Sequence, residues 1–177
     1  MISKTKRSIS ARRRGFWFTT KTGQHIYVEE DETPKEACER VYKEKETSKK
    51  IASVKIEVGK DNVLPELNEK ELKEMGLTEN KPVLVKKSSI ERNMSEHGDV
   101  KPEDFDFMIG NTLYSPDKIV KGKNPDKTYY SFAKRLKISV RNNRPLYGIV
   151  LLDVDKTKDH FEVVHWHWVN EDRIKSI

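Results

Sequence analysis

The chain of 177 residues has a single cysteine, Cys38, and no run of about 18 apolar residues. One cysteine excludes a disulfide framework within the chain, which is typical of a reducing compartment. The missing apolar run excludes an ordinary membrane-spanning helix, and the charged N-terminus lacks the apolar segment of a secretory signal. The sequence therefore predicts a cytoplasmic protein that does not act at a membrane.

The chain carries a modest excess of positive charge. Lysine and arginine number 35 against 29 aspartates and glutamates, which gives a net charge of +6, and hydrophobic residues make up only 34% of the chain. A basic excess attracts polyanions such as nucleic acids, because bound cations release counterions from the phosphates. Composition alone does not identify the polyanion. The length fits one ordinary domain, or a compact domain with a small attachment.

The first 60 residues divide into two predicted segments. Residues 1–14 contain six lysines and arginines and almost nothing apolar, which is typical of a flexible basic arm that either touches nucleic acid or is only a solvated tail. Residues 15–60 predict a β-hairpin, a helix and a short strand over residues 54–58, where Val54, Ile56 and Val58 alternate with polar residues. The helix should begin after Thr33, because Thr33 and Glu36 form a capping-box pattern around Pro34.

The rest of the chain predicts a connector and a larger domain. Residues 61–80 form a polar connector with a short helix, and residues 81–177 form the larger domain. In that domain two helices, the first of them ending near His97, precede three strand-like runs at 128–136, 146–154 and 161–169. Helices followed by an antiparallel meander, with an N-terminal β-hairpin plus helix, predict an α+β fold.

The final strand holds the most informative side chains. Strand residues alternate between faces, so Val163, His165 and His167 should share one face, while Trp166 and Trp168 share the other. Two imidazoles on one face can serve as an acid and a base near neutral pH. A structural role for both histidines is the alternative. A metal pair is disfavoured, because no nearby cysteine or aspartate completes a ligand set.

Cations and aromatic rings alternate in the strand at 128–136. Tyr130 and Lys134 should face one way, and Ser131 and Arg135 the other. Such a mixture suits RNA, because cations meet phosphates and rings stack on bases. The alternative is a half-buried strand whose long cationic side chains reach water. His97 lies at a predicted helix end, where a capping role is the simpler interpretation.

The order of these segments resembles the phage-associated branch of the barnase–EndoU–colicin–RelE (BECR) nuclease superfamily. The resemblance covers residues 83–169, about half of the chain. The stretches that carry it are Val83–Val85, Ile90–His97, Phe105–Ile109, the Ser115-Pro116-Asp117 turn and Tyr129–Arg135. The sequence departs from this pattern early in the helix before His97, where Glu91 stands near the place of an expected histidine.

The resemblance implies metal-independent RNA cleavage, in which the 2′-hydroxyl attacks the adjacent phosphate without any cofactor. It implies a BECR-like fold and a cytoplasmic, phage-encoded toxin or effector that acts on tRNA or another structured RNA. An immunity or antitoxin protein is a possible partner. The implied catalytic residues are His97, Lys134, His165, His167 and Glu91. The implied RNA-binding residues are Arg92, Tyr130, Ser131 and Arg135.

Two other interpretations of the sequence stay open. A non-catalytic nucleic-acid-binding module would use the same basic surface without turnover. A phage structural or anti-host interaction protein would need no cleft, and its basic excess would be incidental.

Overall fold

The computed structural model describes residues 15–139 and 141–176. The chain divides into two compact units, residues 1–46 and 47–177, and the boundary falls within helix α1, Pro34–Ser53. The predicted basic arm, residues 1–14, lies outside the described residues. The domain boundaries predicted at 60/61 and 80/81 stay predictions.

The first unit consists of a hairpin and the beginning of α1. Strands β1, Phe16–Thr19, and β2, His25–Val28, pair antiparallel, as the sequence predicts. The buried face of the hairpin packs against the apolar side of the helix, where Ile26, Val28 and Ala37 form a small core. The capping box is confirmed, since Thr33 and Glu36 exchange hydrogen bonds of 2.7 and 3.2 Å.

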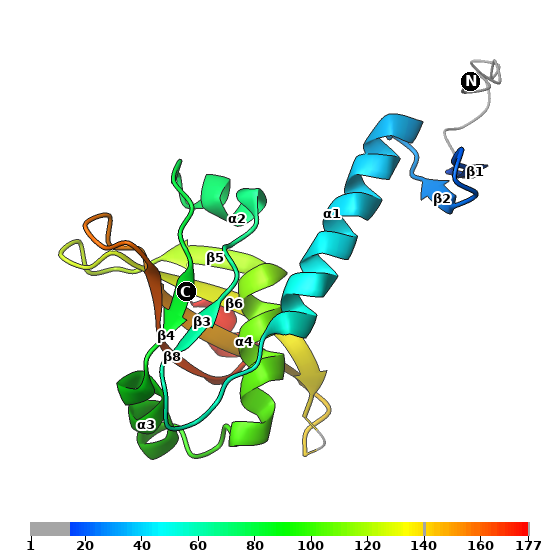
Figure 1. Cartoon of the computed structure of the whole chain (residues 1–177). Coiled ribbons are helices and arrows are strands. Elements are labelled where there is room, and N and C mark those ends of the chain that lie inside the picture. Colours follow the sequence, from blue (N-terminus) through cyan, green and yellow to red (C-terminus); the bar gives the residue numbers. More distant parts are fainter. Residues whose placement is uncertain (1–14, 140, 177) are drawn as a thin grey trace. The chain divides into compact units, whose positions relative to one another are not determined.

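The second unit is built on a six-stranded sheet with the order β3-β4-β8-β7-β6-β5 (Figure 1). The strands are β3 Asn62–Leu64, β4 Val83–Val85, β5 Lys118–Lys121, β6 Tyr129–Ile138, β7 Pro145–Asp153 and β8 Phe161–Asn170. The helices are α2 Glu69–Glu74, α3 Lys87–Glu96, the 3-10 turn η1 Pro102–Asp104, α4 Phe105–Tyr114 and α5 Glu171–Lys175. The predicted α+β class and the meander are confirmed, although β4 joins β8 in parallel.

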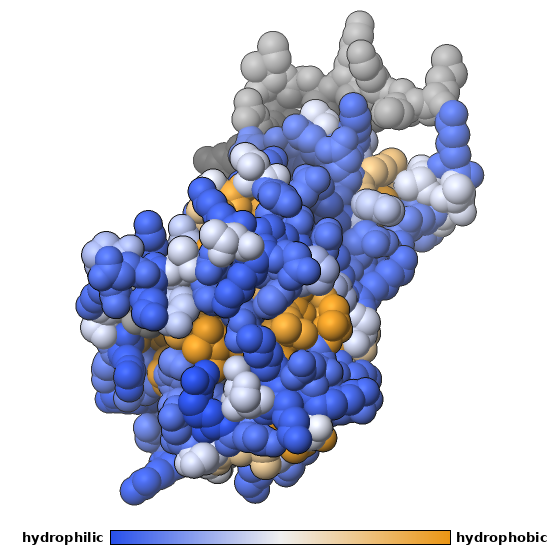
Figure 2. Space-filling view, turned by 60° about the vertical axis from the view of Figure 1, so that its left-hand side comes forward, coloured by the Kyte–Doolittle hydropathy of each residue, from blue (hydrophilic) through white to orange (hydrophobic). Residues whose placement is uncertain are grey.

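Helix α4 covers one face of the sheet and forms the main core with it (Figure 1). Trp166 and Phe105 are fully buried there, with ring centroids 5.1 Å apart in an edge-to-face arrangement. Gly148 lets the helix approach, because a Cβ atom at this position would lie 2.7 Å from Leu136 and 3.1 Å from Met108. Figure 2 shows one face of the molecule, on which hydrophilic residues dominate and hydrophobic ones form small patches.

The predicted strand over residues 54–58 is wrong. Helix α1 continues to Ser53, and the strand of this region is β3, Asn62–Leu64. The apolar residues Val54 and Ile56 alternate with polar ones because of their tertiary contacts, not because they form a strand. Val54 is buried in the main core, and the Ile56 N–H donates a 2.7 Å hydrogen bond to the Asp106 side chain instead of a strand.

Candidate functional site

Helix α3 occupies a strand edge that β4 leaves open. Along β8, strand β4 pairs with just the first two residues, Phe161 and Glu162. Beyond them α3 supplies the partners: Arg92 donates to the Val164 carbonyl at 3.1 Å, and the Asn93 side-chain oxygen accepts the Trp166 N–H at 2.9 Å. These two contacts hold the end of α3 beside the middle of β8.

A β-bulge in β8 decides which side chains share a face. The register shifts between Leu151 and Leu152 of β7, so His165 pairs with Leu151 while Val163 pairs with Leu152. Val163 is fully buried in the main core, and its predicted place beside His165 and His167 is therefore wrong. One extra residue in the bulge reverses the alternation at Val164, which period-two patterning cannot anticipate.

Three imidazoles meet on the sheet face opposite α4. His167 pairs with Ile149, which packs in a small cluster with Ala133 and Val169, away from the main core. His97, the C-cap of α3, stacks on His167 with ring centroids 4.8 Å apart and an angle of 16°. His165 lies 5.6 Å from His97 and 5.2 Å from His167. This histidine cluster joins a helix end to the last strand.

Burial and mutual repulsion keep the strand histidines neutral. Burial, together with the charge of His165 and that of His97, lowers the pKa of His167 to about 4. Burial also lowers the pKa of His165, and the charges of His97 and Arg92 add to the effect. His165 and His167 are therefore unprotonated imidazoles at neutral pH, which is the state that a general base requires.

The structure does not bring Lys134 to this cluster. Lys134 pairs with Gly148, and Gly148 pairs with Trp168, so this lysine lies on the α4 side of the sheet. Its ammonium group contacts Asp117 at 3.2 Å and the Ser115 hydroxyl at 3.3 Å, both just after α4. The contacts give Lys134 a structural role in fixing the Ser-Pro-Asp turn to β6.

Two further predicted site residues lie apart from the histidines. Tyr130 packs against the main core, and its hydroxyl donates to the Met75 carbonyl at 3.1 Å, so its ring is not offered to a base. Glu91 is exposed on α3 and forms an ion pair with Lys87 at 3.8 Å, whereas Ile90 and Asn93 face the sheet.

Three predicted RNA-binding residues have suitable positions. Arg92 is exposed beside the cluster, and its charge contributes to the lowered pKa of His165. Ser131 pairs with Leu151, and Leu151 pairs with His165, so Ser131 shares the face of the histidines. Arg135 is exposed and lies four residues further along the same face of β6.

Sequence reasoning missed three charged neighbours of the cluster. Arg173 of α5 and Asp99, just beyond His97, act electrostatically on His167, and Glu96 acts on His165. Glu96 and Asp99 flank His97 in the sequence, and this proximity could have indicated them. The sequence does not indicate Arg173, because α5 comes close to the cluster only in the folded chain.

The cluster does not have the arrangement of a metal centre. In the part of the chain that the structure describes, no group of three histidine, cysteine, aspartate or glutamate side chains is placed to hold a metal ion. The stacking of His97 on His167 explains this, because parallel rings do not direct their nitrogens toward a common point. Acid–base chemistry suits the geometry better than metal ligation.

We expect Asn93→Ala to lower the free energy of unfolding by about 2 kcal/mol, because it leaves the buried Trp166 N–H without an acceptor. Asn93 itself is fully buried. Urea denaturation measures the change. Ser95→Ala on the exposed side of α3 is the matched control, with an expected effect of less than about 0.5 kcal/mol. Equal stability of the two variants would show that Asn93 does not fasten α3 to β8.

Comparison with known protein families gives a match over most of the chain. A family model described as large polyvalent protein-associated domain 13 matches residues 39–177, which include the whole sheet and the histidine cluster. The match supports the phage association expected from the sequence, and its description states no activity. No curated protein and no solved structure matches the chain. Among the described residues, no helix is long and apolar enough to cross a membrane.

Proposed function

The chain belongs to the large polyvalent protein-associated domain 13 family, and we propose that it is a metal-independent endoribonuclease whose active site is the histidine cluster. The proposal rests on the proximity of His97, His165 and His167, whose ring centroids lie 4.8 to 5.6 Å apart. Membership in the BECR superfamily and a role as a phage-encoded toxin or effector are parts of the same proposal.

The base in this proposal is an imidazole of β8. His165 and His167 are only partly exposed, and their lowered pKa values keep a lone pair free at neutral pH. We assign the base to His165, because Nδ1 of His167 is buried without a hydrogen-bond partner in the described residues, whereas neither ring nitrogen of His165 is in that state. His165 takes the proton of the RNA 2′-hydroxyl as its oxygen bonds to phosphorus.

The acid in this proposal is His97. A proton on one imidazole disfavours a second on its neighbours, since the charge of His97 lowers the pKa of both His165 and His167. The cluster therefore disfavours more than one protonated ring at a time. His97 gives its proton to the 5′-oxygen as the bond between that oxygen and phosphorus breaks, which leaves a 2′,3′-cyclic phosphate on the other fragment.

Arginines replace Lys134 as the cations of the site. Arg92 and Arg173 lie close enough for their charges to act on His165 and His167 respectively. A guanidinium group binds two phosphate oxygens at once, so either arginine suits a phosphodiester whose charge grows during attack. The proposed reaction requires RNA, because DNA lacks the attacking 2′-hydroxyl. Neither a metal nor another cofactor enters any step.

Incubation of the purified chain with total RNA in excess EDTA tests the proposal. We expect cleavage with 2′,3′-cyclic phosphate ends, identified by end-group analysis. Lys134→Ala should cleave within about threefold of the unchanged protein, since Lys134 faces the other side of the sheet. Intact RNA, or cleavage that EDTA abolishes, would contradict the proposed function.

A non-catalytic RNA-binding domain is the second candidate. The stacking of His97 on His167 favours it, because stacked rings with a buried nitrogen also serve as ordinary packing between α3 and β8. This candidate predicts RNA binding that weakens steeply with salt, without any turnover. Binding measured at two salt concentrations, together with RNA that stays intact, would favour it over the nuclease.

A further inference from the structure

Two tyrosines of the described strands share the sheet face of the histidine cluster. Tyr147 of β7 packs in the small cluster with Ala133 and Val169, so its ring is engaged in packing. Tyr129 of β6 is the other, because it alternates with Tyr130, which packs against the main core. Tyr129 is half-buried and belongs to neither cluster. It therefore presents a ring on the face where the proposed reaction takes place.

Tyr129 lies diagonally across the sheet from His165. Ser131 pairs with Leu151, and Leu151 pairs with His165. Tyr129, two residues before Ser131, pairs with Asp153 in the next row. Two strand spacings and one step of two residues place Tyr129 roughly 12 Å from His165. An unpaired nucleotide next to the cleaved phosphate covers this distance, because its base turns away from the backbone.

The charged groups around Tyr129 suit a nucleotide. Asp153 accepts a hydrogen bond from the Thr128 hydroxyl and lies 3.9 Å from the Lys158 ammonium group, so its charge is engaged within the protein. Lys127 is exposed, and its ammonium group lies 5.9 Å from the centre of the Tyr129 ring. Proteins bind single-stranded nucleic acid with this combination, in which the cation meets a phosphate and the ring stacks on a base.

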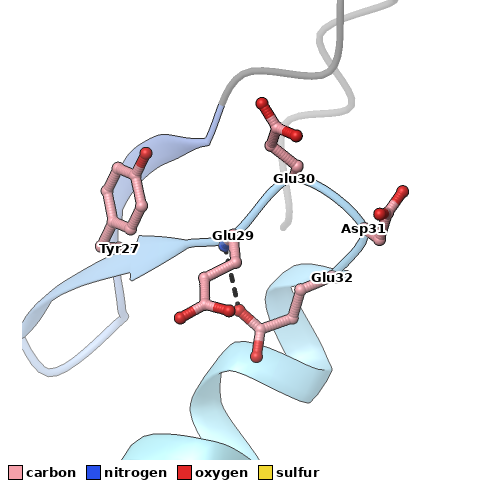
Figure 3. Close-up of a pocket in the computed structure, with 5 residues that line it drawn as sticks. All are labelled: Tyr27, Glu29, Glu30, Asp31 and Glu32. Atoms are coloured by element: carbon pink, nitrogen blue, oxygen red, sulfur yellow. Dashed lines mark hydrogen bonds between the residues drawn. The ribbon is translucent and has the colours of Figure 1, made fainter.

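The cavity of the first unit has a structural explanation instead. It has a volume of about 480 Å³ and is lined by Tyr27 and the acidic residues 29–32 of the turn between β2 and α1 (Figure 3). The Glu29 N–H donates a 3.0 Å hydrogen bond to the Glu32 side chain, and Arg40 binds the same carboxylate at 2.9 Å. These contacts stabilise the turn.

We propose that Tyr129 stacks on the base next to the cleaved phosphate, so that the substrate is single-stranded RNA. The inference rests on the proposed ribonuclease reaction and adds its substrate class. A base stacks on a protein ring when it is unpaired and turned out of a helix. The cleaved phosphate lies at the histidine cluster, Tyr129 holds the neighbouring base, and Lys127 binds a phosphate beside it. Duplex RNA does not offer a base to the ring, since its bases are paired.

Cleavage of a short single-stranded RNA, and of the same RNA annealed to its complement, tests the substrate class. The single strand should be cleaved at least about tenfold faster. Tyr129→Leu should raise the KM for the single strand about fivefold and change kcat less than about twofold, because the stacked base contributes to binding throughout the reaction. Leucine keeps an apolar side chain at this half-buried position, so the strand should stay folded. Tyr129→Phe keeps the ring and should match the unchanged protein within about twofold.

Phe107→Ala is the matched control, since Phe107 is 47% exposed on α4, which covers the other face of the sheet. Its KM should equal that of the unchanged protein. An unchanged KM in Tyr129→Leu, or equal cleavage of single strand and duplex, would overturn the inference and leave the nuclease standing.

Intact RNA in both forms would instead overturn the proposed function. Fluorescence anisotropy with a labelled single strand of 2′-O-methyl RNA then tests the stacking without turnover. Binding about fivefold weaker in Tyr129→Leu, but not in Tyr129→Phe, would support the stacking position. Equal binding by the two variants would overturn it.

Discussion

RNA cleavage should slow at least about 100-fold in His165→Ala, whereas His25→Ala should leave the rate unchanged. His165 is the base of the proposed reaction, and its loss removes the group that accepts the 2′-hydroxyl proton. His25 is exposed on the hairpin and hydrogen-bonds to Thr19, so it reports any nonspecific effect of losing a histidine. Initial rates on a short single-site RNA at neutral pH measure the difference.

The same experiment separates catalysis from binding. An alanine at His165 removes a ring whose centroid lies 5.2 Å from that of His167 and 5.6 Å from that of His97. The hydrogen bonds that hold α3 to the backbone of β8 come from Arg92 and Asn93 and are kept. RNA affinity should therefore change far less than the rate. A loss of affinity that matches the loss of rate would assign His165 to binding and would contradict its role as the base.

Acidification should destabilise the protein between pH 6.5 and pH 4. The pKa of His167 is about 4 in the folded chain, against an ordinary value of 6.5 in the unfolded chain. Within this window the unfolded chain binds more protons, so the stability that neutral His167 contributes is complete above pH 6.5 and is lost as the pH falls toward 4. Because His167 is only partly buried, the loss should be smaller than the roughly 3 kcal/mol to which the full shift corresponds. Urea denaturation at several pH values measures the loss.

His167→Gln isolates this effect from other titrations. The lowered pKa of His165 acts in the same direction, and the raised pKa of the buried Glu71 carboxyl acts in the opposite direction, since protonation favours its burial. Both groups are present in the variant as well. The variant should therefore lose less stability than the unchanged chain over the same window. Identical pH profiles would show that His167 is not buried in its neutral form.

Most of the fold follows from local patterns in the sequence. The Thr33–Glu36 capping box places the start of α1, and alternating apolar residues place β7 and β8 within about a residue of their observed bounds. Patterning failed where tertiary contacts override it. Residues 54–58 alternate like a strand, but Val54 is buried in the main core and Ile56 bonds to Asp106.

The candidate site was predictable only in part. The sequence places two histidines on one face of the last strand and a third at a helix end, and the structure brings these three together. It could not show that Lys134 lies on the opposite face, because that depends on the register across three strands. Nor could it show the bulge at Val164, which arises where α3 replaces β4 at the strand edge.

The most direct test of the central claim is a double-mutant cycle on His97 and His165, measured as RNA cleavage rates in EDTA. Side chains that act as one catalytic unit are strongly non-additive, so the double alanine variant should cleave about as slowly as the slower single variant. Rate losses that multiply would contradict a shared site. So would full activity in the double variant, and the histidine cluster would then be a packing contact between α3 and β8.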